Sequence, residues 1–234
     1  MKTIDYIFDD LKIVQDDEHL KYGTDALLLS AFARGSKKKK ALDLGCGNGV
    51  IALALSYLGK ANKVVGIEIQ ESSALLANES VKINGYENRV EILNADFTDM
   101  PSEYFGSFDY AVSNPPYMKN DGGEKNKLDS LNIARHEVSC NIYSLCKAAS
   151  RLVKFGGDFF TVYRPDRISE LFAALKENNF EIKKLTFVCA RKELSPCLVL
   201  TWAKLGAAPG ADVTPILFLS DEEKMKEIYN GGNI

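Results

Sequence analysis

The sequence predicts a single α/β domain built on a parallel sheet with helices on both faces. Short apolar runs that are typical of strands alternate with amphipathic helical patterns from residue 41 to residue 179. Glycines follow three of the predicted helices, at Gly59, at Gly85 and at the pair Gly156-Gly157, where a left-handed residue commonly ends a helix. Strand–helix alternation at this spacing is typical of a parallel sheet wrapped by helices.

Five strands and four helices are expected in this region. The strands are predicted at 41–44, 63–69, 90–95, 109–113 and 158–163. The helices are predicted near 49–58, 71–84, 140–154 and 166–179.

The alternation stops after residue 180. Two β-rich runs, 185–190 and 197–203, predict an antiparallel hairpin at the edge of the sheet. Residues 221–230 predict a short polar helix. The chain therefore ends in elements that flank the parallel sheet.

The segment before the first strand predicts two small elements. Residues 6–23 are expected to form a hairpin, and residues 24–34 are expected to form a helix. Thr24 is predicted to be the cap of this helix, with Asp25 in its first turn.

Length and charge exclude several classes of protein. A chain of 234 residues fits one domain with extensions, and 46% hydrophobic with 26% charged residues excludes a disordered or collagen-like chain. The longest apolar stretch, 26–33, is far shorter than the roughly 20 residues that span a bilayer, and residues 1–5 show no signal-peptide core. We therefore expect a cytoplasmic protein. The net charge of −3 argues against a chain coated with phosphate-binding charge, but it allows one local basic surface.

The cysteines and histidines give no metal template. The five cysteines contain no C-x-x-C pair, and only His19 and His136 could assist them. We expect reduced thiols and no metal. The cysteines are Cys46, Cys140, Cys146, Cys189 and Cys197.

A glycine-rich turn follows the strand at 41–44. The run Asp43-Leu44-Gly45-Cys46-Gly47-Asn48-Gly49 joins this strand to the next helix, and glycines there allow a ligand to approach the backbone closely. Val50 stands where the dinucleotide fingerprint has its third glycine. No cluster of Lys or Arg surrounds the turn, which favours a nucleoside with a zwitterionic tail over a dinucleotide.

Two more strand tips carry suitable side chains. Glu68 ends the second strand, 23 residues after Gly45, where a carboxylate can accept hydrogen bonds from a ribose diol. Asp96 follows the third strand, where it can accept from an adenine amine while Phe97 covers the ring. Taken singly, these residues could equally be polar strand ends; together they predict a nucleoside pocket at the carboxyl edge of the sheet.

The sharpest signal is Asn114-Pro115-Pro116-Tyr117, directly after the strand at 109–113. Two prolines hold the chain extended and remove two N–H donors, which leaves carbonyl acceptors. The Asn114 amide adds another acceptor, and Tyr117 adds a flat ring. Such a loop can hold a planar amine by its two hydrogens and stack on its ring. The alternative is a rigid turn with a half-buried tyrosine.

These motifs resemble the class I S-adenosylmethionine-dependent methyltransferases that modify exocyclic amines. Residues 22–29 and 133–137 further resemble segments of the bacterial tRNA(Val) adenine N6-methyltransferase group. The resemblance implies a Rossmann-like fold, with a seven-stranded, mostly parallel sheet and a C-terminal antiparallel hairpin. It also implies an N-terminal extension at 1–36, a hairpin plus a helix that closes over the cofactor, and a methyltransferase domain at 37–234.

The resemblance assigns roles to individual residues, with S-adenosylmethionine as cofactor. Asn114 and the Pro115 carbonyl would hold the target amine, and Tyr117 would stack on the base. Asn114 would also border the cofactor. Asp43, Gly45 and Gly47 would hold the amino-acid tail of the cofactor, and Glu68 would hold its ribose. Asp96 and Phe97 would hold its adenine, and Thr24 and Asp25 would close over its methionine portion.

Basic residues could form a phosphate-binding rim around the pocket. The candidates for RNA contact are Lys119, Arg135, His136, Arg191 and Lys192. A solvated surface is the alternative for the lysines and arginines, and a structural packing role is the alternative for His136. The run Lys37 to Lys40 is interpreted as a solvated face in preference to a binding surface.

The predicted reaction is methyl transfer to the N6 amine of adenine in RNA, with tRNA near the anticodon as the favoured substrate. Asn-Pro-Pro-Tyr loops also fit a protein glutamine N5-methyltransferase or an rRNA guanine-N2 methyltransferase. A non-catalytic module that binds nucleosides or RNA is the alternative from another class. We expect a monomer or a weak dimer.

Overall fold

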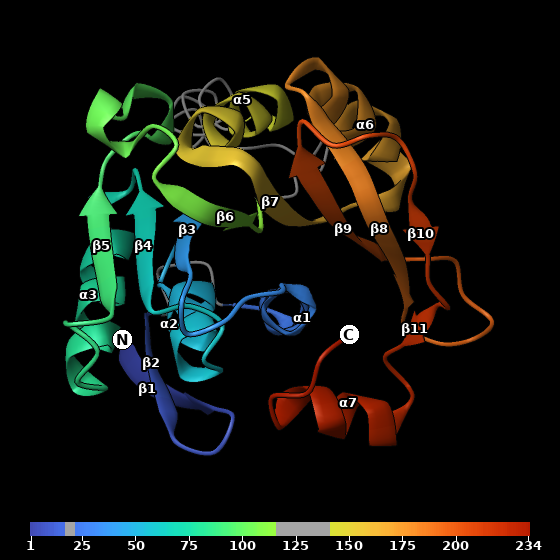
Figure 1. Cartoon of the computed structure of the whole chain (residues 1–234). Coiled ribbons are helices and arrows are strands. Elements are labelled where there is room, and N and C mark those ends of the chain that lie inside the picture. Colours follow the sequence, from blue (N-terminus) through green and yellow to red (C-terminus); the bar gives the residue numbers. More distant parts are fainter. Residues whose placement is uncertain (17–21, 116–140) are drawn as a thin grey trace, which may run out of the picture.

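The computed structural model describes residues 1–16, 22–115 and 141–234 of the chain (Figure 1). The expected roles of Pro116, Tyr117, Lys119, Arg135 and His136 fall outside these ranges. A sheet runs through the middle of the molecule, with helices on both of its faces (Figure 1).

The sheet has the predicted parallel core. Its order is β10-β8-β9-β7-β6-β3-β4-β5, and β11 also pairs with β8. All neighbours are parallel except β9, which is antiparallel to both β7 and β8. The strands of the core are β3 (Lys40–Leu44), β4 (Lys63–Glu68), β5 (Val90–Asn94), β6 (Phe108–Ser113) and β7 (Val153–Tyr163).

Two hydrophobic clusters, one on each face, hold the helices to the sheet. One face is covered by α1 (Thr24–Phe32), α2 (Val50–Tyr57) and α3 (Glu71–Ile83). The other is covered by α5 (Ile142–Leu152) and α6 (Ile168–Glu177). The described part of the chain also contains 3-10 turns at Phe97–Asp99, Ser102–Tyr104 and Pro165–Arg167. The predicted helices and strands of the core are confirmed.

Two of the three glycine positions end helices as predicted. Gly59 and Gly85 follow α2 and α3 with φ of 66° and 65°. Gly156 also has a positive φ, 75°, but it lies inside β7, and α5 already ends at Leu152. The register between β6 and β7 shifts from Phe108↔Val153 to Tyr110↔Asp158, so the glycine pair belongs to a bulge that lengthens β7 and shortens the predicted helix.

The predicted cap of the first helix is wrong by one residue. Gly23 is the N-cap of α1, with extended φ and ψ and no side-chain hydrogen bond, and Thr24 is the first helical residue. Asp25 lies in the first turn as predicted. The extended backbone needed at an N-cap is found at Gly23, so the helix starts one position earlier than a Thr24 cap would place it.

The N-terminal hairpin is displaced towards the start of the chain. It consists of β1 (Lys2–Ile7) and β2 (Leu11–Asp16), rather than residues 6–23. β1 is mostly exposed and carries no buried alternation, so its sequence gives little strand signal. The hairpin is fastened to α3 by a hydrogen bond from the Val14 amide to Ser80 Oγ, 2.9 Å long.

The C-terminal hairpin is present, and the tail of the chain covers it. β8 (Phe180–Cys189) and β9 (Leu198–Leu205) pair over most of their length. Two short strands that the sequence does not predict, β10 (Asp212–Val213) and β11 (Leu217–Phe218), add to the outer side of β8. The predicted polar helix is α7 (Glu222–Tyr229). No helix of the described residues is long and apolar enough to cross a membrane.

Candidate active site

The glycine turn is tied to the neighbouring strand through its backbone. The amides of Gly45 and Cys46 both donate to the Ile67 carbonyl, at 2.9 and 3.0 Å. Gly45 and Gly47 have φ of 71° and 55°, values that favour glycine. A Cβ atom built on either residue meets no atom within 4 Å, so the space in front of the turn is open. This space leaves room for the close approach of a ligand that the sequence predicts, and the approach itself stays a prediction.

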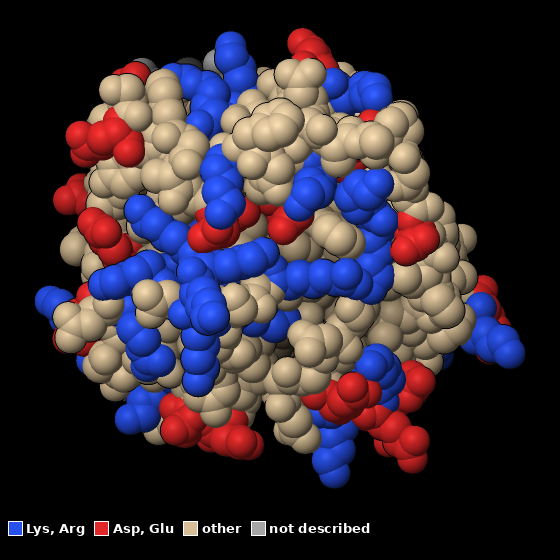
Figure 2. Space-filling model, viewed as in Figure 1, with Lys and Arg blue, Asp and Glu red and all other residues tan. Residues whose placement is uncertain are grey.

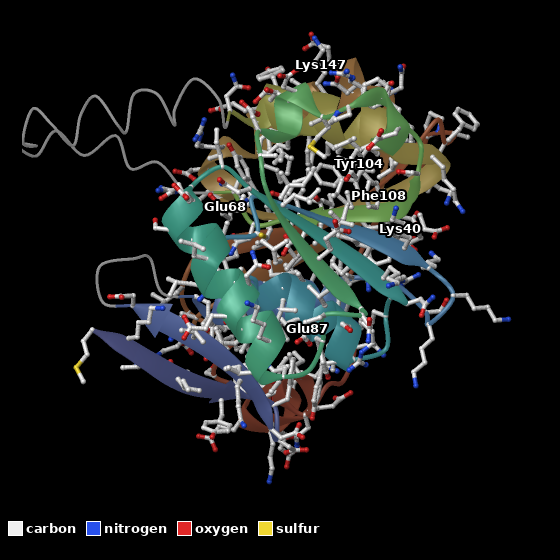
Figure 3. All side chains as sticks on the ribbon, turned by 90° about the vertical axis from the view of Figure 1, so that its left-hand side faces the viewer. Lys40, Glu68, Glu87, Tyr104, Phe108 and Lys147 are labelled. Atoms are coloured by element: carbon white, nitrogen blue, oxygen red, sulfur yellow. The ribbon has the colours of Figure 1, made fainter. Side chains whose placement is uncertain are left out.

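Glu68 is buried behind this turn at the tip of β4 (Figure 3). Its Oε2 accepts from the Gly47 amide and its Oε1 from the Gln70 amide, each at 2.9 Å. A carboxylate oxygen has two lone pairs, so each oxygen can accept one more hydrogen bond. Glu68 therefore braces the turn and still has acceptor capacity for a diol.

Asp43 lies under the turn and is fully buried. Its Oδ2 accepts from the Ala52 amide in the first turn of α2, at 3.0 Å, while its Oδ1 has no hydrogen-bond partner within the described residues. Burial raises the pKa of Asp43 to about 7, and the nearby Glu68 carboxylate adds to the rise. A buried carboxylate oxygen without a hydrogen-bond partner can accept from a donor or contact a cation of a ligand.

Asp96 and Phe97 follow the carboxyl end of β5, and Phe97 lies in the core. Asp96 caps the following turn, because its Oδ1 accepts from the Thr98 amide and hydroxyl, at 2.8 and 2.7 Å. Phe97 is 9% exposed and packs in the cluster under α5. The predicted roles of both residues towards adenine stay predictions.

The tip of β6 leads into the Asn-Pro-Pro-Tyr loop. Ser113 Oγ donates to the Leu44 carbonyl at 2.7 Å, which joins the end of β6 to the end of β3. Asn114 is half-buried and Pro115 is buried, so the loop begins directly beside the glycine turn. Adjacent strand ends thus bring together residues that lie 69 positions apart in the chain, Leu44 and Ser113.

The remaining described candidates are Thr24, Asp25, Arg191 and Lys192. Thr24 is exposed and Asp25 half-buried at the start of α1. Arg191 and Lys192 are exposed in the turn after β8, which runs in the same direction as β7 and therefore ends at the carboxyl edge. Their contacts with substrate stay predictions.

Two supporting residues are absent from the sequence prediction. Asn94 donates through its Nδ2 to the Glu68 and Ile69 carbonyls, at 2.9 and 3.1 Å, and so fixes the backbone that carries Glu68. Ser113 joins β6 to β3 as described above. Both are polar residues at the last position of an apolar strand. This pattern alone does not distinguish a residue that supports the backbone of the site from one that binds a ligand.

The comparisons with known proteins agree with this geometry. A family model described as a methyltransferase domain matches residues 35–230. A protein of Bacteroides thetaiotaomicron named tRNA1(Val) (adenine(37)-N6)-methyltransferase is 33% identical over 172 residues, which cover 73% of this chain and 70% of that protein. The chain belongs to this methyltransferase family.

Two further members with the same name match different shares of their own length. The protein of Photorhabdus laumondii is 32% identical over 67% of this chain, and the match spans 63% of that protein. The protein of Histophilus somni is 26% identical, and the match spans 99% of this chain and 92% of that protein.

Solved structures confirm the fold of this methyltransferase. A predicted O-methyltransferase of Agrobacterium tumefaciens superposes with a TM-score of 0.71 at 21% identity, over 90% of this chain and 98% of that one. TYW2 of Pyrococcus horikoshii, in complex with MeSAdo, superposes with a TM-score of 0.61 at 16% identity, over 88% and 72%. The predicted Rossmann-like class I fold and the predicted family are both confirmed.

The residues of this methyltransferase fit S-adenosylmethionine, the predicted cofactor. The open space before Gly45 and Gly47 accommodates a ligand against the backbone. The orphaned Asp43 Oδ1 and the spare acceptor positions of Glu68 match an ammonium group and a ribose diol. Within the described ranges, no group of three or more His, Cys, Asp or Glu could hold a metal ion.

Proposed function

We propose that this methyltransferase transfers a methyl group to the N6 amine of adenine 37 in a valine tRNA. The observation that carries the proposal is the joint between β6 and β3, where the Ser113–Leu44 hydrogen bond sets Asn114 and Pro115 beside the open glycine turn. The names of the relatives support adenine in tRNA as the substrate. The cytosolic location predicted from the sequence is part of this proposal.

Each strand tip has a part in holding the cofactor. Gly45 and Gly47 line the space for its amino-acid end, with Asp43 beneath them, and Glu68 binds the ribose hydroxyls. Asp96 accepts from the adenine amine. In this arrangement S-adenosylmethionine supplies an electrophilic methyl group on a positively charged sulfur.

Asn114 and Pro115 activate the target amine. The lone pair of an aromatic exocyclic amine is delocalised into its ring, so the amine is a poor nucleophile. The Asn114 side-chain oxygen and the Pro115 carbonyl each accept one of its two hydrogens, which localises the lone pair and aims it at the methyl carbon. One N–C bond forms as one S–C bond breaks, and the proton lost from nitrogen passes to solvent.

This chemistry depends on position more than on acid–base strength. The amine proton becomes acidic only as the new bond forms, so no strong base is needed. Well-oriented reactants can gain about 7–11 kcal/mol from orientation alone. The adenine has to leave its base stack to reach the loop. The exposed Arg191 and Lys192 lie at the same edge of the sheet, where they hold the sugar–phosphate backbone of the RNA.

The N-terminal segment 1–36 contributes the start of α1. We place Thr24 and Asp25, at the start of this helix, over the methionine portion of the cofactor, as the family resemblance implies. The hairpin itself is fastened to α3 through Val14 and Ser80, so its part in this arrangement is to anchor the segment.

The proposal is tested by identifying the methylated nucleoside. The enzyme is incubated with methyl-labelled cofactor and two unmodified valine tRNA transcripts, one with adenine and one with guanine at position 37. Digestion and chromatography should show labelled N6-methyladenosine from the first transcript only. Equal labelling of both transcripts would contradict position 37 as the target.

The same experiment separates the alternatives. Total RNA and total protein from a cell extract serve as competing acceptors in parallel incubations. Label recovered as N2-methylguanosine would favour the rRNA guanine reaction, and label recovered as N5-methylglutamine would favour the protein reaction. Either result, with unlabelled tRNA, would replace the proposed substrate.

A further inference from the structure

The edge of the sheet opposite the active site carries a concentrated positive surface. Figure 3 shows Glu68 and Lys40 at opposite ends of the parallel strands. Figure 2 shows a band of Lys and Arg side chains crossing the face where the segment between α1 and β3 lies in Figure 1. We define the basic band as the run Lys37 to Lys40 together with Lys63, Lys154 and Lys204.

Sheet pairing gathers these lysines from distant parts of the chain. Lys40 and Lys63 are direct partners in the β3–β4 register. Asp109 at the start of β6 accepts from the Lys40 amide at 2.7 Å and pairs with Lys154. Asp158 lies within 3.6 Å of Lys39 and 3.2 Å of Lys204. The band is therefore one surface and not four separate loops.

The two carboxylates do not neutralise the band. Among the described residues, no carboxylate pairs with the side-chain amines of Lys37, Lys38 or Lys40. Lys37 and Lys38 are exposed, and the ammonium of Lys40 lies 4.6 Å above the Phe108 ring. Lys63, the register partner of Lys40, donates from its ammonium to the Asn88 carbonyl, which carries no charge. The chain carries an overall charge of −3, so this excess is local.

Two shapes beside the band suit a nucleic acid. Phe155 is 83% exposed, follows Lys154 directly and leans on the backbone of Gly206, which makes it a supported stacking surface. A hollow of about 470 Å³ lies beside Lys40 and Lys63; its charged lining also includes Lys82 and Arg89 together with Glu87 and Glu91. Lysines beside exposed rings bind RNA by joining phosphate contacts to base stacking.

We infer that the basic band binds the sugar–phosphate backbone of the substrate tRNA outside its anticodon loop. The inference rests on the proposed function. The parallel strands are five or six residues long, so the two edges lie on the order of 16 to 20 Å apart. A tRNA whose anticodon loop enters the carboxyl edge would pass along the side of the enzyme and meet the band with a second region of its backbone.

The test compares full-length tRNA with the isolated anticodon stem-loop. The variant Lys38→Glu/Lys63→Glu changes two exposed side chains of the band. The control, Lys147→Glu/Lys176→Glu, makes the same charge change on the exposed sides of α5 and α6. Dissociation constants for both RNAs are measured at several salt concentrations, together with cofactor binding and methyl transfer.

We expect the band variant to bind full-length tRNA on the order of tenfold more weakly, because phosphate contacts carry most of such affinity. The slope of log affinity against log salt should fall by about two, since each lost phosphate contact removes about one. Affinity for the stem-loop, cofactor binding and all properties of the control should stay at the wild-type values.

Each other outcome has one meaning. Unchanged tRNA affinity in the band variant, or an equal loss in the control, would overturn the inference and leave the proposed function intact. An equal loss for the stem-loop would also overturn it, because the band would then act at the anticodon. Failure of the wild-type enzyme to methylate either RNA would overturn the proposed function and this inference together.

Discussion

The two edges of the sheet differ in charge and in how their charged groups are held. At the carboxyl edge, Asp43 and Glu68 are buried and fixed by backbone amides at 2.9 to 3.0 Å. At the amino edge, Lys37, Lys38 and Lys63 are exposed. A buried, fixed carboxylate suits recognition of one small ligand, whereas exposed lysines on long side chains suit a polyanion of variable shape. The carboxyl edge of the sheet is thus suited to binding the cofactor, and the amino edge is suited to binding RNA.

The largest expected effect lies at the carboxyl edge. Replacing Asn114 by Ala removes one of the two acceptors that we assign to the target amine. We expect the rate of methyl transfer to fall by about 100-fold or more, as for the loss of a preorganised hydrogen-bonding group. Single-turnover transfer from labelled cofactor to tRNA measures this rate.

The matching observation for Asn114→Ala is RNA affinity. Because the amino edge is untouched, full-length tRNA should bind as tightly as to the wild type. A variant that keeps near-normal methyl transfer would contradict the role of this loop.

A methyl group at Gly47 should block the cofactor. Gly47→Ala places a Cβ in the open space before the turn, and we expect cofactor affinity to fall on the order of 10- to 100-fold by isothermal titration calorimetry. Gly85→Ala is the control, because Gly85 has a similar φ of 65° and no atom within 4 Å of its Cβ, but follows α3. Each change strains the backbone by about 1–2 kcal/mol, so equal binding by both variants would contradict the cradle.

Lys60 tests whether every lysine near the amino edge serves binding. It is buried, and its ammonium donates to the Ser30 and Ala31 carbonyls at the end of α1, at 2.8 and 2.6 Å. Lys60→Met should lower the free energy of unfolding by about 1–3 kcal/mol and leave tRNA affinity unchanged. The control Lys63→Met should weaken tRNA binding and change the free energy of unfolding by no more than about 0.5 kcal/mol.

The pH dependence of stability gives Lys60 a signature. Burial lowers its pKa to about 8 from 10.5, so between these values the unfolded chain binds more protons than the folded one. In urea unfolding, the free energy of unfolding of the wild type should therefore increase relative to that of Lys60→Met as the pH rises from 8 to 10.5. A constant difference would show that the ammonium is not buried in solution.

Asp43 gives cofactor binding a pH dependence. The pKa of Asp43 is about 7 in the folded chain, so below pH 7 the ammonium group of the cofactor would meet a neutral acid. Cofactor affinity should therefore fall by up to about tenfold per pH unit below 7. Asp43→Asn should bind more weakly at pH 8 and lose this dependence. Stability without cofactor has the opposite sign, since the raised pKa favours folding at low pH and that contribution is lost as pH rises through 7.

The sequence predicts the carboxyl edge better than the amino edge, for a physical reason. Residues such as Gly45, Glu68 and Asn114 each follow a strand that is visible locally, and parallel strands bring their ends together whatever their exact order. The lysines of the basic band become neighbours only through the order β4-β3-β6-β7-β9, which no local pattern contains. From the sequence alone, the run Lys37 to Lys40 is therefore interpreted as a solvated face.

Elements of two residues lie below the reach of sequence patterns. β10 and β11 are set by pairing with β8, including a hydrogen bond between the Thr186 and Thr214 hydroxyls, 2.7 Å long. The bulge at Gly156 is similarly fixed by the register with β6. In both places the partner strand, and not the segment itself, decides the structure.

The cover on β8 gives the tail of the chain a protective role. An uncovered outer strand offers a row of free amides and carbonyls on which another chain can add a strand. β10 and β11 occupy part of that row, at residues 184–185 and 188–189 of β8, and Met225 and Ile228 of α7 pack into the core beneath α1. Cutting the chain after β9 would expose both the row and the apolar surface, so the last turns of the protein guard it against self-association.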